Sequence, residues 1–229
     1  MGIAALQVLA LTGFECQRYR PAYAQRMSVL AVAVVVLGYV LGTFPTAVLV
    51  GRRHGFDPTT SGSGNPGASN ATRVGGMRAG AVVLLGDAGK GALAAGLGHL
   101  VDGRALAWFA GAAAVAGHLW PVTRGLRGGK GVATAAGVAF VCAPLAAVPL
   151  AVVFVVLVKA TGKAAIGSIA LAVLLPLGVA ALGQRWFEVV VAAAIGLVVV
   201  VRHRTNIARL LDGSESVVRD RTAGPGGTA

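Results

Sequence analysis

Residues 27–51 read MSVLAVAVVVLGYVLGTFPTAVLVG, a run of 25 residues without a charged side chain. A helix needs about 20 mostly apolar residues to cross the hydrocarbon core of a bilayer. The whole chain of 229 residues has this character, since 56% of it is hydrophobic and only 12% is charged. A soluble domain has roughly a quarter of its residues charged. The composition therefore excludes an ordinary soluble domain and a disordered chain, and predicts an all-α polytopic membrane protein.

Further apolar stretches predict the other membrane helices. They cover residues 79–100, 105–123, 131–158, 164–183 and 186–201. Pro144 and Pro149 interrupt the stretch over 131–158, and proline breaks a helix because it lacks an N–H donor. We interpret that stretch as two helices meeting near Cys142–Pro144. The prediction is seven transmembrane helices, two of them short.

The distribution of basic residues predicts the orientation. An odd number of spans places the two termini on opposite sides. If the C-terminus is cytoplasmic, 14 of the 20 Lys and Arg residues fall in cytoplasmic segments, which is the known bias of membrane proteins. The net charge of +12 therefore mainly reflects the orientation of the spans in the membrane. A nucleic-acid partner is not expected, because nucleic-acid binders carry far more polar surface.

The chain divides into three parts. Residues 27–211 form a single transmembrane domain, and residues 212–229 form a cytoplasmic tail that is flexible after Glu215. Residues 1–26 contain Arg18, Arg20 and Arg26, which this topology would place outside. We interpret them as an N-terminal extension ahead of an alternative start at Met27, or as an amphipathic surface stretch.

The first polar stretch is Ser61-Gly62-Ser63-Gly64-Asn65-Pro66-Gly67-Ala68-Ser69-Asn70-Ala71-Thr72-Arg73. Its glycines have G-x-G-x-x-G spacing, but a dinucleotide site requires a preceding strand, and none is expected here. Backbone N–H groups of such a loop, with hydroxyls and a guanidinium, can surround an anion. The alternative is a flexible polar loop.

The second polar stretch is Leu126-Arg127-Gly128-Gly129-Lys130-Gly131-Val132-Ala133-Thr134. It differs from a nucleotide-binding P-loop because Lys130 is not followed by Ser or Thr. A glycine loop with a lysine at a helix N-terminus is nevertheless a suitable phosphate site. The alternative is a basic cytoplasmic loop that happens to contain glycine.

The third polar stretch, Arg202-His203-Arg204-Thr205-Asn206, follows the last span. His203 and Asn206 share a helical face, where one can titrate near neutral pH and the other can only hydrogen-bond. The alternative is a basic collar beside lipid headgroups.

Two polar positions lie inside predicted spans. Asp87 and Lys90 are three residues apart, and an internal ion pair is the simplest interpretation, with a polar cavity as the alternative. For Ser168 we expect a hydrogen bond to the carbonyl four residues earlier. The sequence has neither a metal-ligand motif nor a Ser-His-Asp arrangement, so we predict no metal site.

Taken in order, these stretches resemble the bacterial integral-membrane acyl-phosphate:glycerol-3-phosphate acyltransferases, the PlsY family. The resemblance spans residues 42–215. Its segments are Gly42-Thr43-Phe44-Pro45, Gly62 to Asn70, Asp87-Ala88-Gly89-Lys90-Gly91, Gly117-His118-Leu119-Trp120-Pro121, Gly128 to Thr134, Arg202 to Ile207, and Gly213-Ser214-Glu215.

The resemblance implies an enzyme of the bacterial inner membrane with its active site facing the cytoplasm. Such an enzyme moves an acyl group from acyl phosphate to the 1-hydroxyl of sn-glycerol 3-phosphate, giving lysophosphatidic acid and phosphate, the first step of phospholipid synthesis. It implies no cofactor and no metal, and we expect membrane lipid but no obligate protein partner around it.

The resemblance also implies the site residues. The catalytic positions are Ser63, Lys130, His203 and Asn206. The substrate-binding positions are Asn65, Arg73, Gly128, Gly129, Gly131 and Ser168, and Glu215 matches a structural acid. Thr205 and Ala165 depart from the family, which often has Glu and Ser there.

The chemistry of these residues agrees with that activity. Both substrates carry a phosphate, and phosphate is a good leaving group, so no acyl-enzyme is needed. Binding both anions side by side supplies proximity, up to about 7–11 kcal/mol in ideal cases. Lys130 and Arg73 would offset developing negative charge, and His203 or a substrate phosphate would accept the proton. An anion or phosphate transporter and a diverged non-catalytic paralogue remain the alternatives.

Overall fold

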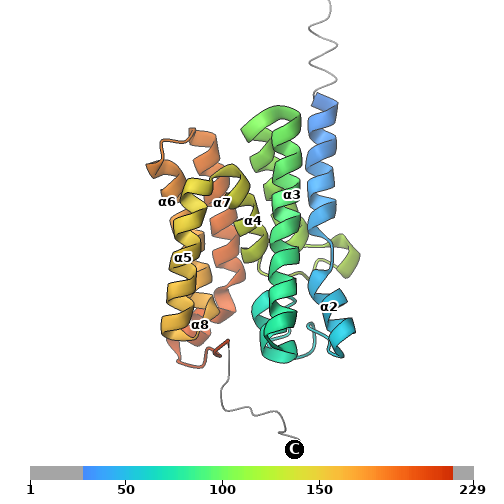
Figure 1. Cartoon of the computed structure of the whole chain (residues 1–229), viewed down its shortest axis with the longest axis vertical. Coiled ribbons are helices and arrows are strands. Elements are labelled where there is room, and N and C mark those ends of the chain that lie inside the picture. The colour runs from blue at the N-terminus through green and yellow to red at the C-terminus, as the bar shows by residue number, and fades with distance from the viewer. Residues whose placement is uncertain (1–27, 219–229) are drawn as a thin grey trace, which may run out of the picture.

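The computed structural model describes residues 28–218, and every regular element within this range is helical (Figure 1). The interpretation of residues 1–26 lies outside the described residues. After a first helix over residues 28–42, the elements are α2 (Thr46–His54), α3 (Ala68–Leu119), η1 (Val122–Arg124), α4 (Val132–Cys142), α5 (Pro144–Thr161), α6 (Ala164–Ala181), α7 (Trp186–Arg202) and α8 (Arg204–Leu211). The predicted all-α class is confirmed.

The first apolar stretch is helical but broken. The helix over residues 28–42 ends at Thr43, whose hydroxyl donates to the Val40 carbonyl at 2.7 Å. Pro45 then precedes α2. Proline cannot donate a backbone hydrogen bond, so the helix is interrupted here. The break frees the Phe44 carbonyl to accept from Lys90 Nζ at 3.2 Å.

Helix α3 contains two of the predicted spans. It has 52 residues, and a straight helix of that length would extend about 78 Å. Instead, Asp102 and Gly103 have non-helical dihedral angles, and the chain folds back there (Figure 1). The expectation of separate helices over 79–100 and 105–123 is confirmed. A second non-helical residue, Gly76, separates a short polar start from the apolar part of α3.

The proline-containing stretch divides as predicted. Ala143 has φ −145° and ψ 60°, and Pro144 begins α5. Proline suits the first turn of a helix, where its missing N–H would have no partner. This leaves α4 only 11 residues long, with its N-terminus inside the bundle rather than at the end of a long span.

Close packing of small residues joins α4 to α3. A Cβ atom added at Gly137 would lie 1.9 Å from the Ala88 carbonyl oxygen, so only glycine fits. Trp108, Leu119 and Val138 are fully buried where these helices meet α6 and α7.

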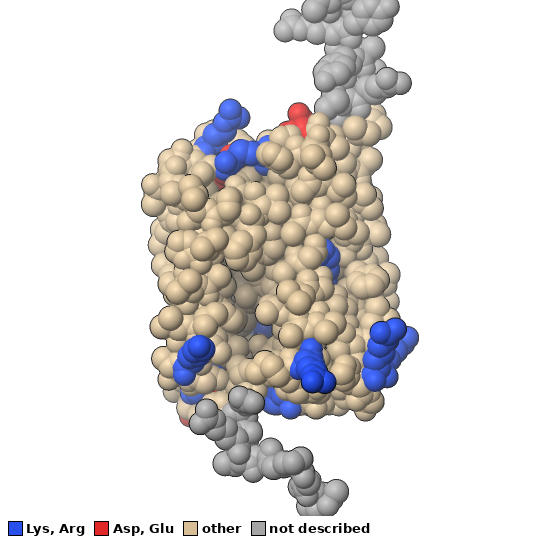
Figure 2. All heavy atoms as spheres, viewed as in Figure 1, with Lys and Arg blue, Asp and Glu red and all other residues tan. Residues whose placement is uncertain are grey.

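The outer surface is apolar. Leu85, Leu145 and Leu197 are each more than 60% exposed. Figure 2 shows a broad uncharged band, with the charged side chains mostly at the two ends of the molecule. Among residues 28–218, four helices are long and apolar enough to cross a membrane, or five if α7 and α8, which are bent by 57°, count as one span.

Candidate functional site

A cavity of about 280 Å³ lies where the 61–73 loop, α3, the start of α4, α6 and the α7–α8 junction meet. It gathers most of the predicted site residues from distant parts of the chain. Its walls include Ser63, Asn65, Arg73, Lys130, Gly131, Ser168, His203, Asn206 and Glu215. Gly128 and Gly129 are absent from these walls.

The two missing glycines have another place in the fold. The N–H groups of Gly128 and Gly129 donate to the carbonyls of Leu119 and His118, each at 3.1 Å. Their own carbonyls accept from the Arg202 guanidinium at 2.9–3.2 Å. Both peptide groups are therefore engaged within the protein, which leaves these glycines to shape the loop rather than bind an anion.

The next residues offer donors that face the cavity at the start of α4. Gly131 caps the N-terminus of α4 with φ 85°, and no side chain caps the first turn. Gly131, Val132 and Ala133 all line the cavity beside Lys130. Unpaired N–H groups at a helix N-terminus, with an ammonium next to them, form a phosphate site.

A chain of polar contacts fixes Lys130. Its Nζ donates to Asn206 Oδ1 at 2.5 Å, and Asn206 Nδ2 donates to Glu215 Oε1 at 2.7 Å. Glu215 is also paired with Arg209 at 2.8 Å. Burial lowers the pKa of Lys130 from 10.5 to about 8, opposed by Glu215 and assisted by nearby arginines. The ammonium is thus held in place yet can titrate near neutral pH.

His203 lies at the junction of α7 and α8 and is 3% exposed. Its Nδ1 is 2.8 Å from the Val199 carbonyl oxygen. A carbonyl can only accept, so Nδ1 carries the hydrogen and Nε2 is the acceptor of the neutral ring. The ring can therefore accept a hydrogen bond from a hydroxyl in the cavity, while burial lowers the pKa of His203 to about 4 and disfavours the protonated ring.

Asn70, which had no predicted role, organises the first loop. It is 2% exposed, and its Oδ1 accepts from the Ser63 N–H at 2.8 Å. Its Nδ2 donates to the carbonyls of Pro58 and Ser61, both at 3.0 Å. These bonds fix the loop that presents Ser63 to the cavity. Three residues further along α3, Arg73 makes long contacts of 3.4 Å to the Val217 carbonyl, which leaves its donors available.

The ion pair within the membrane helices is confirmed. Lys90 Nζ lies 2.9 Å from Asp87 Oδ1, and both side chains are buried. His118 joins them, with Nδ1 3.6 Å from the same oxygen. Asp87 and His118 reach the cavity wall, so the pair also borders the site.

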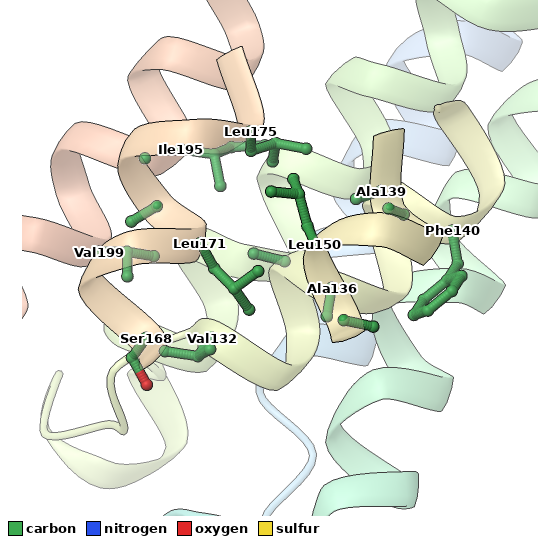
Figure 3. Close-up of a pocket in the computed structure, with 15 residues that line it drawn as sticks. Val132, Ala136, Ala139, Phe140, Leu150, Ser168, Leu171, Leu175, Ile195 and Val199 are labelled. Carbon is green, nitrogen blue, oxygen red and sulfur yellow. The ribbon is translucent and has the colours of Figure 1, made fainter. Parts of the chain in front are cut away.

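An apolar crevice of about 50 Å³ adjoins the cavity. It lies among α4, α5, α6 and α7, and Leu150, Leu171 and Leu175 are among its lining residues (Figure 3). Ser168 and Val132 line both spaces and lie together at one end of the crevice. As predicted, the Ser168 hydroxyl donates to the Ala164 carbonyl, at 2.8 Å. The polar site thus continues into an apolar pocket.

Comparison with known proteins identifies the family. Residues 32–213 match the family model described as glycerol-3-phosphate acyltransferase. The chain belongs to this acyltransferase family. The glycerol-3-phosphate acyltransferase of Neisseria meningitidis serogroup B is 37% identical over 82% of this chain and 96% of its own length. That of Desulforudis audaxviator is 40% identical over 83% and 97%.

Solved structures agree with this family assignment. A crystal structure of PlsY (YgiH), an integral membrane glycerol 3-phosphate acyltransferase in its glycerol 3-phosphate form, has a TM-score of 0.79 and 34% identity. It covers 82% of this chain and 94% of that one. The lysophosphatidic acid form has a TM-score of 0.77 and 33% identity. The chain is therefore an integral membrane acyltransferase of the PlsY type.

Proposed function

We propose that this acyltransferase moves a fatty acyl group from acyl phosphate to the 1-hydroxyl of sn-glycerol 3-phosphate. The products are lysophosphatidic acid and inorganic phosphate. One observation carries the proposal: a single cavity contains two groups of anion-binding donors and continues into an apolar crevice. Two phosphorylated substrates, one of them with an acyl chain, match this combination.

The connection between the two spaces supports one arrangement of the substrates. The acyl chain lies in the crevice and passes Val132 and Ser168, so the donor phosphate lies at the N-terminus of α4 beside Lys130. Glycerol 3-phosphate has no apolar part and occupies the other side, with its phosphate at Arg73 and its polar groups at Ser63 and Asn65. The two molecules then meet next to His203 and Asn206.

The reaction needs no covalent enzyme intermediate. The glycerol 1-hydroxyl oxygen attacks the acyl carbonyl carbon, and the bond from that carbon to the phosphate oxygen breaks as phosphate leaves. The hydroxyl proton passes to His203 Nε2 or to a substrate phosphate oxygen. Lys130 and the N–H groups of the first turn of α4 stabilise the charge that develops on the leaving phosphate.

The membrane arrangement is part of the proposal. Seven crossings follow if the folded-back α3 counts as two spans and α4 and α7 each count as one. The described chain begins and ends at opposite ends of the bundle, as an odd number requires (Figure 1). With the C-terminal end in the cytoplasm of a bacterial inner membrane, the cavity opens toward soluble glycerol 3-phosphate.

The ordered domain extends slightly beyond residue 211. Glu215 binds Asn206, and the Val218 N–H donates to the Gly162 carbonyl at 2.8 Å. Residues 215, 216 and 218 also form part of the cavity wall. We therefore extend the catalytic domain at least to residue 218.

A comparison of acyl donors tests the function. Purified protein is supplied with labelled glycerol 3-phosphate and either acyl phosphate, acyl-CoA or acyl-carrier protein. Only acyl phosphate should give labelled lysophosphatidic acid. Lys130→Ala should remove nearly all activity, whereas Lys159→Ala, which changes an exposed lysine outside the cavity, should not.

Three results would contradict the proposal. Full activity of Lys130→Ala would show that Lys130 is not needed for acyl transfer. Phosphate flux into liposomes without lysophosphatidic acid formation would indicate a transporter, and inactivity with all three donors would indicate a non-catalytic paralogue.

A further inference from the structure

A second groove lies on the outside of the bundle, between the helix over residues 28–42, α2, α3 and the η1 turn. It encloses about 710 Å³ and shares no lining residue with the catalytic cavity. Its charged lining residues are Arg52, Lys90 and Arg124, and no Asp or Glu is among them. The remaining walls are mainly apolar.

The excess positive charge of the groove comes from the two arginines. The positive charge of Lys90 is balanced within the protein, because Asp87 accepts a hydrogen bond from its ammonium at 2.9 Å. Arg52 is exposed. The Arg124 Nε is shielded from solvent and lacks a hydrogen-bond partner among residues 28–218. A shielded guanidinium N–H without an acceptor is costly, so this position favours an anionic ligand.

The apolar walls indicate what carries that anion. Val40, Phe44 and Leu93 line the groove and are each more than half exposed, so they face the hydrocarbon around the bundle. A molecule that satisfies both features has a phosphate at one end and acyl chains at the other. Clusters of Lys and Arg beside membrane helices are known to bind the headgroups of anionic lipids.

We propose that this groove binds one anionic phospholipid of the surrounding membrane. Its phosphate lies between Arg52 and Arg124, and its acyl chains run along Val40, Phe44 and Leu93. The site is separate from the acyl-donor crevice and does not depend on the proposed reaction, because it uses neither the cavity nor any residue assigned to catalysis.

Native mass spectrometry of the full-length purified protein tests this site. The protein in detergent is titrated with phosphatidylglycerol, and the fraction carrying one lipid is measured. Arg52→Gln and Arg124→Gln should each weaken binding about fivefold, as expected for one cation near a lipid headgroup. Arg53→Gln and Arg127→Gln change neighbouring exposed arginines outside the groove and should bind like the wild type.

Three outcomes would overturn the proposal. The first is unchanged binding in both groove variants. The second is equally tight binding of zwitterionic phosphatidylcholine, and the third is complete displacement of the lipid by millimolar inorganic phosphate, which would indicate a site for free anions. Arg52→Lys and Arg124→Lys keep the charge and should retain most of the binding, which separates loss of the site from loss of the fold.

Discussion

At the scale of single residues, Lys130 combines two properties that its sequence position alone does not provide. Its ammonium is fixed by Asn206, which is fixed in turn by Glu215. It also lies near Arg73, Arg202 and Arg209, whose charges help burial to lower its pKa. A sequence shows a lysine between glycines, but the surrounding arginines come from three other parts of the chain.

This environment predicts a pH dependence. The pKa of Lys130 is lowered to about 8, so the ammonium is present below that pH and is lost as the pH rises through it. We therefore expect kcat/KM to fall above about pH 8, because kcat/KM reports ionisation of the free enzyme. Lys130→Arg keeps its charge throughout this range and should lack the fall, although its activity will be lower. Identical pH profiles for the two proteins would assign the fall to another group.

Asn70 shows where sequence reasoning stopped short. The stretch from Gly62 to Asn70 was expected to present Ser63 and Asn65, and the structure brings both to the cavity. The buried amide that holds the loop was not expected, because its three partners become neighbours only when the loop closes on the start of α3. A second asparagine in the same polar stretch as Asn65 was the available signal.

Replacing Asn70 should damage substrate binding more than the global fold. Asn70→Ala leaves the Pro58 and Ser61 carbonyls without their donor, at about 1–3 kcal/mol for a buried polar group. We expect the KM for glycerol 3-phosphate to rise at least tenfold while the KM for acyl phosphate changes little. Thr59→Ala, on the exposed part of the same loop, is the control. Parallel increases in both KM values would show that Asn70 acts on the whole cavity.

At the scale of the elements, apolar stretches and prolines were enough to predict the long helices and the break at Ala143. They did not predict the break at Thr43–Pro45, the non-helical Gly76 or the bend between α7 and α8. Glycine is so common in this chain, with 34 residues, that no single one signals a kink. The same abundance conceals which glycines are needed for packing.

Two glycines on α3 should respond differently to the same change. A Cβ atom at Gly91 would lie 2.1 Å from the Thr134 carbonyl oxygen, whereas one at Gly89 would meet nothing within 4 Å. Gly91→Ala should therefore destabilise the protein by about 1–3 kcal/mol through overpacking. Gly89→Ala should be neutral or stabilising, since alanine favours helix. Thermal unfolding in detergent measures both, and equal melting temperatures would contradict the close contact between α3 and α4.

At the scale of the whole molecule, a net charge of +12 on a chain with few charges has two explanations. On the face that Figure 2 shows, most of the described cations lie toward the ends of the apolar band, as expected for loops beside a membrane. A minority, including Arg73 and Lys130, come together at one cavity. Composition predicted the first group and the family resemblance named Arg73 and Lys130, whereas the fold brings these two residues together across a long stretch of sequence.

The proposed topology can be tested with single cysteines in a variant carrying Cys16→Ser and Cys142→Ser. His54 and Ser214 are exposed, as are Asp102 at the turn of α3 and Leu182 after α6. The turn of α3 and the connection from α6 to α7, which contain Asp102 and Leu182, lie at one end of the bundle, and α2 and α8 lie toward the other (Figure 1). With a cytoplasmic C-terminus, an impermeant maleimide should label Asp102→Cys and Leu182→Cys in intact spheroplasts. It should reach His54→Cys and Ser214→Cys only after permeabilisation. The opposite labelling pattern would show that the protein has the inverted orientation, with the catalytic cavity facing away from the cytoplasm. Labelling of both His54→Cys and Leu182→Cys from the same side would rule out seven spans.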